Sequence, residues 1–440
     1  MAKYDVVIIG GGTAGCAAAY ISGKLGLKTL LLEKGIHLGG TITSGLVIPV
    51  MNNGKNQINT EFYTTLINEL KKVGGQVTYQ NNPGWFNPEL TKIVLDKMMN
   101  DVNVEIRFNT QVINANTTSN SINSIQITTK TLSPYIAQLY NDNNQYLEQD
   151  ILSESIEARY YFDTTGNCEF SKLINCEFLK DPEELQPMSL RFIMGGVDVK
   201  RFSKWLLEID SDRNVTTVEE INGVTHLSTA YTWDTDKHWA LAPFFDDAVK
   251  KNILKDSDRN YFQVFTVAGM SDSVAFNCPR IVENLNPNLT KDTSKALLKG
   301  RESIFRISEF CRSYLPGFER SYISNIADML GIRVSNRIRG KYVYTIEDLK
   351  TGKKFANPAL ISNYPIDVHT KDKNSSTLEK TGEYQLPVES LLSYNYDNLV
   401  VAGRGISADY LSQGALRVQA SCFSMGEAAA KYIAKQINNA

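Results

Sequence analysis

Apolar residues near the N-terminus follow the pattern of buried strands joined by a helix. Residues 4–9 (YDVVII) are a β-branched run that ends in glycines, which is typical of a central parallel strand. Residues 28–33 (KTLLLE) predict a second strand, and the small residues between the two runs predict a short helix. Residues 104–108 predict a third strand. The chain is therefore expected to begin with a βαβ unit.

Residues 87–100 carry helical periodicity. The segment opens with Asn87, whose side chain can cap a helix, and with Pro88, which suits the first helical position. Similar patterns occur in three other segments, which cover residues 59–73, 293–313 and about 414–438.

Between residues 112 and 163 the pattern changes to that of β-strands. Strands over 124–129 and 155–162, separated by a polar stretch around 140–145, predict an antiparallel insertion. Further strands are expected over 189–195, 261–268 and 398–402, and the polar residues 370–383 predict a solvated loop.

Composition narrows the class of partner. Hydrophobic residues make up 42% and charged residues 21%, as in ordinary globular proteins, and the net charge is -2. This charge offers no field for nucleic acid or anionic membranes, and no stretch approaches the roughly 20 apolar residues of a membrane span. With no basic segment before the first apolar run, we interpret the chain as a cytoplasmic protein whose partner is a small molecule.

The cysteines and histidines show no metal-binding spacing. The six cysteines are scattered without a Cys-x-x-Cys pair, which is typical of buried free thiols, and none is expected to pair in a disulfide-reductase motif. The four histidines have no spacing that suits a metal. No bound metal is expected.

A glycine-rich turn carries the strongest chemical signal. Residues 10–15 (GGGTAG) match G-x-G-x-x-G directly after the first strand and at the start of a helix. In such a turn Gly10 permits the tight bend, Gly12 lets the backbone approach a pyrophosphate, and Gly15 lets the helix pack on the strand. Glu33 follows Gly15 by 18 positions at the end of the second strand, where it can accept hydrogen bonds from a ribose. The unit is expected to bind a dinucleotide.

Four further segments can bring backbone close to the same ligand. They are 38–41 (LGGT), 163–166 (DTTG), 400–404 (VVAGR) and the helix after Gly414, whose N-terminus could face a flavin ring. The residues expected to bind the cofactor are Gly10, Gly12, Ala14, Gly15, Glu33, Lys34, Gly39, Gly40, Thr41, Val112, Thr165, Gly166, Gly403, Arg404 and Gly414.

In the order of these motifs, the chain resembles the FAD-dependent oxidoreductase family with a glutathione-reductase-type FAD domain, and more distantly the fumarate reductase flavoproteins. The resemblance covers nearly the whole chain; it includes 10–19 (GGGTAGCAAA), 38–49 (LGGTITSGLVIP), 331–348 (GIRVSNRIRGKYVYTIED) and 401–430. It implies FAD, a C-terminal return of the chain into the FAD domain, and redox chemistry at flavin N5. His37 stands too close to the paired glycines to match the histidine that anchors flavin covalently in fumarate reductases, so noncovalent FAD is expected.

The expected fold class is therefore α/β: a Rossmann-like FAD-binding domain with a central parallel sheet and a β insertion, and an α+β substrate cap domain. Residues 1–187 and 326–440 are assigned to the FAD-binding domain, and residues 188–325, which contain no nucleotide motif, to the cap.

The expected function is an FAD-dependent oxidoreductase that transfers hydride between a small-molecule substrate and flavin N5. The alternative is a flavin-binding electron-transfer subunit of a larger complex without its own substrate. The chain has no second G-x-G-x-x-G, so no tightly held nicotinamide domain is expected, and transient reduction by NAD(P)H or by another electron donor stays open. The motifs leave the substrate, the direction of turnover, the electron partner and the oligomeric state open.

Polar residues of the C-terminal half that FAD binding does not require are candidates for catalysis. Arg333 could capture a carboxylate, and Arg337 would share its helix face if this segment were helical. His369 follows Asp367 by two positions, so on a strand the carboxylate could orient or charge the imidazole. Arg404 could stabilise reduced flavin or anchor substrate, and Tyr410 could donate a proton.

Overall fold

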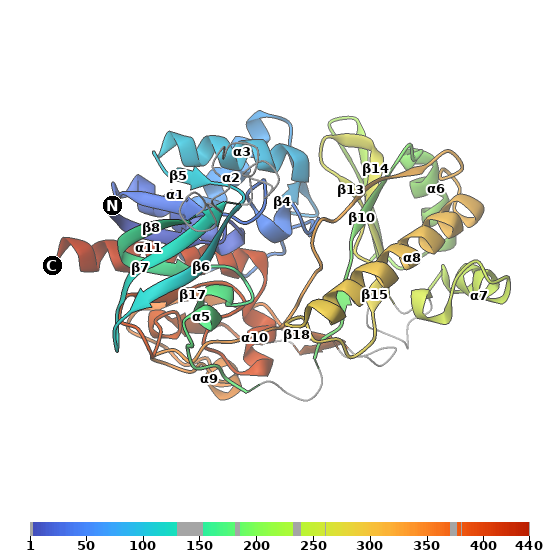
Figure 1. Cartoon of the computed structure of the whole chain (residues 1–440). Helices are drawn as coiled ribbons and strands as arrows, with labels where there is room; N and C mark the ends of the chain where they lie inside the picture. Colours follow the sequence, from blue (N-terminus) through green and yellow to red (C-terminus); the bar gives the residue numbers. More distant parts are fainter. Residues whose placement is uncertain are drawn as a thin grey trace, which may run out of the picture.

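The chain folds into two lobes, each built around one sheet (Figure 1). The computed structural model describes residues 3–129, 153–180, 185–231, 239–259, 261–369, 376–379 and 381–439. One lobe contains both chain ends and a seven-stranded sheet, and the other contains a six-stranded sheet from the middle of the sequence.

The seven-stranded sheet contains the predicted parallel strands at its centre. β1 (Lys3–Ile9) lies between β2 (Thr29–Leu32) and β8 (Ser153–Asp163), parallel to both. β5 (Glu105–Arg107) extends the sheet beyond β2, and β21 (Leu399–Val401) pairs in parallel with the end of β8. The C-terminal strand thus returns to the N-terminal sheet, and the predicted α/β class with a central parallel sheet is confirmed.

The β insertion differs in one respect from the prediction. β6 (Thr110–Thr117) and β7 (Ile122–Thr129) form an antiparallel pair, and β7 pairs in the same way with the first residues of β8. The rest of β8 runs between β1 and β21, so the strand predicted at 155–162 is also a central strand of the parallel sheet. The polar stretch at 140–145 lies outside the described residues.

Helices α1 (Thr13–Lys24) and α11 (Gln419–Asn438) pack against one another beside this sheet. Both are rich in alanine, and small side chains let two helix backbones come close. α2 (Glu61–Lys72) and α3 (Pro88–Asp101) lie on the same side of the molecule and contact α1. α3 begins as predicted, because the Asn87 side chain accepts hydrogen bonds from the backbone N–H groups of Glu89 and Leu90.

The second lobe is an antiparallel sheet covered by helices. Its strand order is β11 (Thr216–Ile221), β12 (Val224–Tyr231), β13 (Phe262–Val267), β14 (Met270–Phe276), β10 (Phe192–Gly195) and β16 (Tyr322–Ile326). The long helix α8 (Thr290–Tyr314) crosses this lobe in Figure 1, together with α6 (Val199–Ile209) and α7 (Ala242–Lys250). Buried aromatic rings fill its core, including the stacked pair Phe192 and Phe276 at 4.3 Å between centroids.

Short elements complete the fold. Three two-stranded pairs are β9 (Met188–Ser189) with β15 (Arg280–Ile281), β17 (Pro358–Ser362) with β20 (Tyr384–Pro387), and β18 (Ile366–His369) with β19 (Ser376–Glu379). A fourth pair, β3 (Gln76–Tyr79) and β4 (Asn82–Phe86), follows α2. The remaining helices are α5 (Glu169–Leu173), α9 (Ile346–Thr351) and α10 (Tyr410–Leu416).

Three local predictions are wrong. Residues 189–195 are not one strand, because β9 and β10 pair with strands of different sheets and residues 190–191 belong to neither. Part of the loop predicted at 370–383 is strand β19, which pairs with β18; residues 370–375 and 380 lie outside the described ranges. The C-terminal helix is two helices, α10 and α11, because residues 417–418 interrupt it.

Two further features concern the cysteines and the polarity of the helices. All six cysteines are buried and unpaired, as their scatter predicted. Within the described ranges, every helix is too short or too polar to span a lipid bilayer.

Candidate active site

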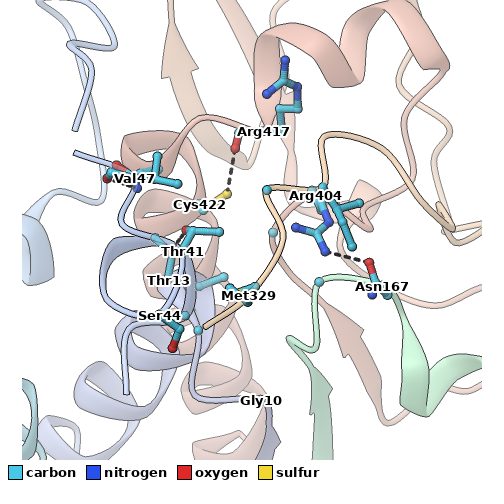
Figure 2. Close-up of a pocket in the computed structure, with 18 of the residues that line it drawn as sticks. Gly10, Thr13, Thr41, Ser44, Val47, Asn167, Met329, Arg404, Arg417 and Cys422 are labelled. Atoms are coloured by element: carbon cyan, nitrogen blue, oxygen red, sulfur yellow. Dashed lines mark hydrogen bonds between the residues drawn. The ribbon is translucent and has the colours of Figure 1, made fainter. Parts of the chain in front are cut away.

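A cavity of about 1290 Å³ runs between the two lobes. Its walls include the glycine turn after β1, the loops after β2 and β8, and polar side chains from the second lobe. Figure 2 shows Gly10 toward one end of this cavity and Arg417 toward the opposite end, with Arg404 and Asn167 on one side. One chamber therefore joins the predicted dinucleotide site to the second lobe.

The glycine turn forms a cradle without side chains at the first end. Gly10 has a positive φ of 105°, and a Cβ there would lie 2.8 Å from the Thr164 backbone. Gly12 has open space beside it, because a Cβ would meet only the Thr164 carbonyl oxygen at 3.9 Å. Gly12 also caps α1, so the first N–H groups of that helix have no intrahelical acceptor. These features suit a pyrophosphate, which needs close backbone donors.

Glu33 lies at the same end of the cavity as the glycine turn. It follows β2, lines the cavity, and accepts hydrogen bonds from the backbone N–H groups of Gly11 and Gly35, both at 2.7 Å. Each carboxylate oxygen can accept a second hydrogen bond, so the group can hold this loop and still bind two hydroxyl groups.

The turn after β8 lies directly beside the glycine cradle. The Thr164 hydroxyl donates to the Gly10 carbonyl oxygen at 2.6 Å. Asp163, fully buried, accepts hydrogen bonds from the hydroxyl groups of Thr165 and Ser171 at 2.7 and 2.6 Å. Asp163 therefore fixes the shape of the turn that brings Thr165 and Gly166 to the cavity wall.

Most of the predicted cofactor residues line the cavity. They are Gly10, Gly12, Ala14, Glu33, Lys34, Gly40, Thr41, Val112, Thr165, Gly166, Gly403 and Arg404.

Three predicted residues do not line it. Gly15 packs α1 on β1, since a Cβ would lie 1.9 Å from the Gly10 carbonyl oxygen, and Gly39 donates its N–H to the Gly11 carbonyl oxygen at 2.8 Å. Gly414 is inside α10, where it packs against Val368 and Asp367, so it is not the start of a helix that faces the cavity. That position belongs to α11, whose flanking residue Val418 lines the cavity.

The predicted substrate residues separate into two groups. Arg333, His369 and Arg404 line the cavity. Tyr410 begins α10 and is not among the lining residues, which removes the reason for assigning it proton donation. The segment of Arg333 is not helical, and Arg337 instead donates to the Ala408 carbonyl oxygen at 2.9 Å, away from the cavity.

His369 and Asp367 lie on one face of β18, as their spacing predicted. The Nε2 atom of His369 lies 3.2 Å from Asp367 Oδ1, and Nδ1 lies 2.9 Å from a guanidinium nitrogen of Arg280. Because arginine can only donate, Nδ1 accepts and Nε2 carries the hydrogen that points to Asp367. Burial, followed by the charge of Arg333, lowers the pKa of His369 to about 3. Of the two roles predicted for Asp367, these contacts therefore favour orienting a neutral imidazole over charging it.

This arrangement predicts acid sensitivity. A histidine in the unfolded chain has a pKa near 6.5, so it becomes protonated below that pH, whereas His369 in the folded protein stays neutral down to about pH 3. The free energy of unfolding therefore falls as the pH drops from about 6.5 toward 3. Between pH 7 and pH 4.5 this histidine should lower the free energy of unfolding of the wild-type protein by roughly 2–3 kcal/mol, and His369→Gln should not show that decrease. Urea unfolding of both proteins at the two pH values measures it. An equal loss in the variant would contradict the neutral, buried imidazole.

Sequence reasoning missed several residues at the second-lobe end. Arg191 follows β9, Tyr261 precedes β13, Arg280 lies on β15 and Arg417 separates α10 from α11. Tyr261 lines the cavity with Arg191 and Arg417, and the Arg280 guanidinium lies 4.1 Å from the centroid of its ring. The sequence offered one signal for a buried charged residue at this end: Arg191 stands inside an apolar run, between Leu190 and Phe192.

Gln413 connects the two arginine-bearing loops of the site. Its buried amide donates to the backbone carbonyl oxygens of Arg333 and Arg404 at 3.1 and 3.2 Å. The Arg404 side chain donates to Asn167 Oδ1 at 2.6 Å and lies against Gly166. Arg404 thus lies beside the turn after β8, and Figure 2 shows it on the same side of the cavity as Asn167.

The described side chains do not meet the requirements of a metal site. Across the described ranges, no group of three or more His, Cys, Asp or Glu side chains is arranged to hold a metal ion.

Comparison with known proteins identifies the matching family and several partial relatives. A family model described as FAD dependent oxidoreductase matches residues 5–142 and 145–439. Thiamine thiazole synthase of Metallosphaera sedula is 50% identical over 44 residues, which are 10% of this chain and 16% of that protein. Digeranylgeranylglycerophospholipid reductase of Methanocaldococcus jannaschii is 38% identical over 64 residues, 14% of this chain and 16% of that protein. The chain thus matches 16% of the length of each of these two relatives.

Among solved structures, a geranylgeranyl bacteriochlorophyll reductase-like protein from Thermoplasma acidophilum has a TM-score of 0.47 and 14% identity. The match covers 99% of this chain and 79% of that one.

Proposed function

The chain belongs to the FAD dependent oxidoreductase family and uses FAD, and we propose that it moves hydride between a carbon atom of a small molecule and flavin N5. One observation carries this proposal: a single cavity has a side-chain-free glycine cradle at one end and a cluster of charged and aromatic side chains at the other. An enzyme that reacts a small molecule with a long dinucleotide needs both ends in one chamber.

We propose that the first end holds the FAD without a covalent bond. The N–H groups at the start of α1, beside Gly12, suit the pyrophosphate, and the Glu33 carboxylate suits the adenosine ribose. The backbone of Thr165 and Gly166 would flank the same ligand, and Arg404 would add positive charge beside it. Bound FAD supplies the redox chemistry, and these residues bind and orient it.

Residues 188–325 are proposed as the substrate cap. The six-stranded sheet lies within this range except for one residue of β16. Gln263 on β13 and Asn277, directly after β14, line the cavity wall. Support for a cap function comes from this contribution, because side chains from the second lobe close the cavity over the first.

On the substrate side, the chain's own groups orient the ligand and hold protons. Arg280 and Asp367 keep His369 in one neutral tautomer, so its ring is a positioning group. Tyr261 is a better candidate for proton donation than Tyr410. Its hydroxyl oxygen accepts a hydrogen bond from Asn277 at 2.9 Å, and burial raises its pKa, so the hydroxyl keeps its own proton.

The first test is the flavin itself. Purified protein is expected to be yellow, and acid precipitation should release FAD rather than FMN because the cradle is built for a pyrophosphate. An anaerobic screen that follows flavin absorbance, with NAD(P)H and small organic molecules as probes, should then find a compound that bleaches or reoxidises it. A colourless protein that cannot be reconstituted with FAD overturns the proposal. Flavin that reacts only within a complex with a protein partner would favour an electron-transfer subunit.

A further inference from the structure

Positive charge gathers at the second-lobe end of the cavity. Arg191, Arg333 and Arg417 line this end, and Arg280 lies directly behind His369. Within the described part of the chain, Asp367 is the one carboxylate in ion-pair contact with any of these four arginines, through Arg417 at 3.3 Å. Asp367 also accepts a hydrogen bond from His369, so its negative charge is shared between Arg417 and the imidazole. The four arginines together with Asp367 therefore carry a net positive charge.

Arg191 is the least compensated member. Among the described residues its guanidinium makes no hydrogen bond or ion pair, and its Nε atom is buried without a partner. Burial lowers its pKa to about 10, so it still carries its charge at neutral pH. A cation held without a counter-charge weakens the folded protein, and such sites persist where a ligand supplies the missing charge.

Arg333 and Arg417 extend the same positive surface. Arg333 is 8% exposed and donates to the Pro187 carbonyl oxygen at 2.6 Å, a contact that supplies no negative charge. Burial, then the charges of Arg280 and Arg417, lower the pKa of Arg333 to about 9. The Arg417 guanidinium donates to the Asp367 carbonyl oxygen at 2.8 Å, while its Nε atom has no partner. Each guanidinium therefore has donors left for a ligand.

We infer that the substrate of this enzyme carries a carboxylate group, which Arg191 binds together with Arg333 and Arg417 at the second-lobe end of the cavity. This inference rests on the proposed function. Planar guanidinium groups match the two oxygens of a carboxylate. Hydride chemistry acts on carbon, and a carboxylate is the common anionic group bonded directly to carbon, so it places the charge next to the reacting atom.

The phosphates of FAD do not explain this charge. The glycine cradle lies toward the other end of the cavity, and Figure 2 separates Gly10 from Arg417. Arg404 is bound to Asn167 beside Gly166, which places it with the cofactor residues. Arg404 thus supplies positive charge beside the cofactor residues, and the charge of Arg191, Arg333 and Arg417 is left for the substrate.

Carboxylate binding can be measured before the substrate is known. Acetate, succinate and benzoate are titrated into the purified holoprotein at constant ionic strength, and chloride, sulfate and phosphate serve as comparison anions. The readouts are the thermal unfolding midpoint and the difference spectrum of the bound flavin. At least one carboxylate should raise the midpoint and perturb the spectrum saturably, while the inorganic anions should have much weaker effects.

Arg191→Met keeps the side-chain volume and breaks no hydrogen bond or ion pair with any described residue, so it is the sharpest variant. It should bind the responsive carboxylate roughly 10- to 100-fold more weakly, yet should be at least as stable as wild type when no ligand is present. Arg201→Met is the matched control and should retain the full response, because Arg201 is an exposed residue of α6 that pairs with Glu319. If Arg191→Met does not fold, Arg191→Lys keeps the charge and should show weakened binding.

Several results would overturn the inference. They are a wild-type protein that responds to none of the carboxylates, a variant at Arg191 that responds as wild type does, and an equal response to chloride or sulfate. Acid release of FAD from every sample keeps the two proposals apart. A protein without flavin overturns the proposed function, whereas flavin-loaded protein without an Arg191-dependent response overturns the carboxylate inference alone.

Discussion

Glu33→Ala protein is expected to purify with little or no FAD. The wild-type carboxylate stands at the cavity wall after β2 with lone pairs free on both oxygens. Two charge-assisted hydrogen bonds to the ribose would contribute roughly 1.5–3 kcal/mol each. Their loss should raise the dissociation constant of FAD by about 10²- to 10⁴-fold. The ratio of absorbance at flavin and protein wavelengths, and titration of FAD into deflavinated protein, measure the effect.

The same substitution also removes the contacts with Gly11 and Gly35, so the controls must separate loop shape from ribose binding. Glu33→Gln keeps the volume and one acceptor oxygen, and it should bind FAD with intermediate affinity. Glu169→Ala removes another carboxylate at the cavity wall, one that pairs with exposed Lys34, and it should retain FAD. Wild-type affinity in Glu33→Ala would show that the ribose assignment is wrong.

The cofactor end of the site could be predicted because its signals are local. Gly10, Gly12 and Glu33 lie within one βαβ unit, where strand, turn and helix follow each other along the chain. The position of each residue is then fixed by the element beside it, as Asn87 shows for α3. The family resemblance extended this knowledge to the turn after β8 and to the return of β21 to the sheet.

The substrate end could not be predicted in the same way, because its residues come from distant segments. Arg191, Tyr261, Arg280 and Arg417 meet only after the second lobe has closed over the first. Their individual sequences resemble ordinary strand or helix ends, so no local pattern distinguishes them from structural arginines. His369 was identified through its spacing from Asp367, but the sequence does not reveal Arg280, whose approach fixes the tautomer.

Predictions of element boundaries failed for the same physical reason. Residues 189–195 have the composition of one strand, yet their two ends pair with different partners, β15 and β14. Gly414 has the sequence position of a helix start, yet tertiary packing against β18 places it inside α10. Pairing and packing between distant segments override local propensity at these sites.

Gly426→Ala is expected to lower both the stability of the protein and its flavin content. Gly426 is in α11, where a Cβ would lie 2.2 Å from the carbonyl oxygen of Ala14 and 3.1 Å from the Cβ of Ala17. Both neighbours belong to α1, so backbone must move rather than a flexible side chain. Overpacking of this kind costs typically about 1–3 kcal/mol, and the higher helix propensity of alanine returns at most about 1 kcal/mol. The yield of soluble protein and its thermal midpoint report the loss.

The same change should weaken FAD binding, although Gly426 is not among the residues that line the cavity. Ala14 is the second residue of α1, so separating α1 from α11 displaces the N–H groups that are proposed to bind the pyrophosphate. Gly382→Ala is the matched control, because its Cβ would meet nothing within 4 Å, and it should change neither stability nor flavin content. If Gly426→Ala matches Gly382→Ala in both measurements, the close contact of α1 and α11 does not position the cofactor site. A variant that folds with reduced midpoint and low flavin content would instead link helix packing directly to the glycine cradle.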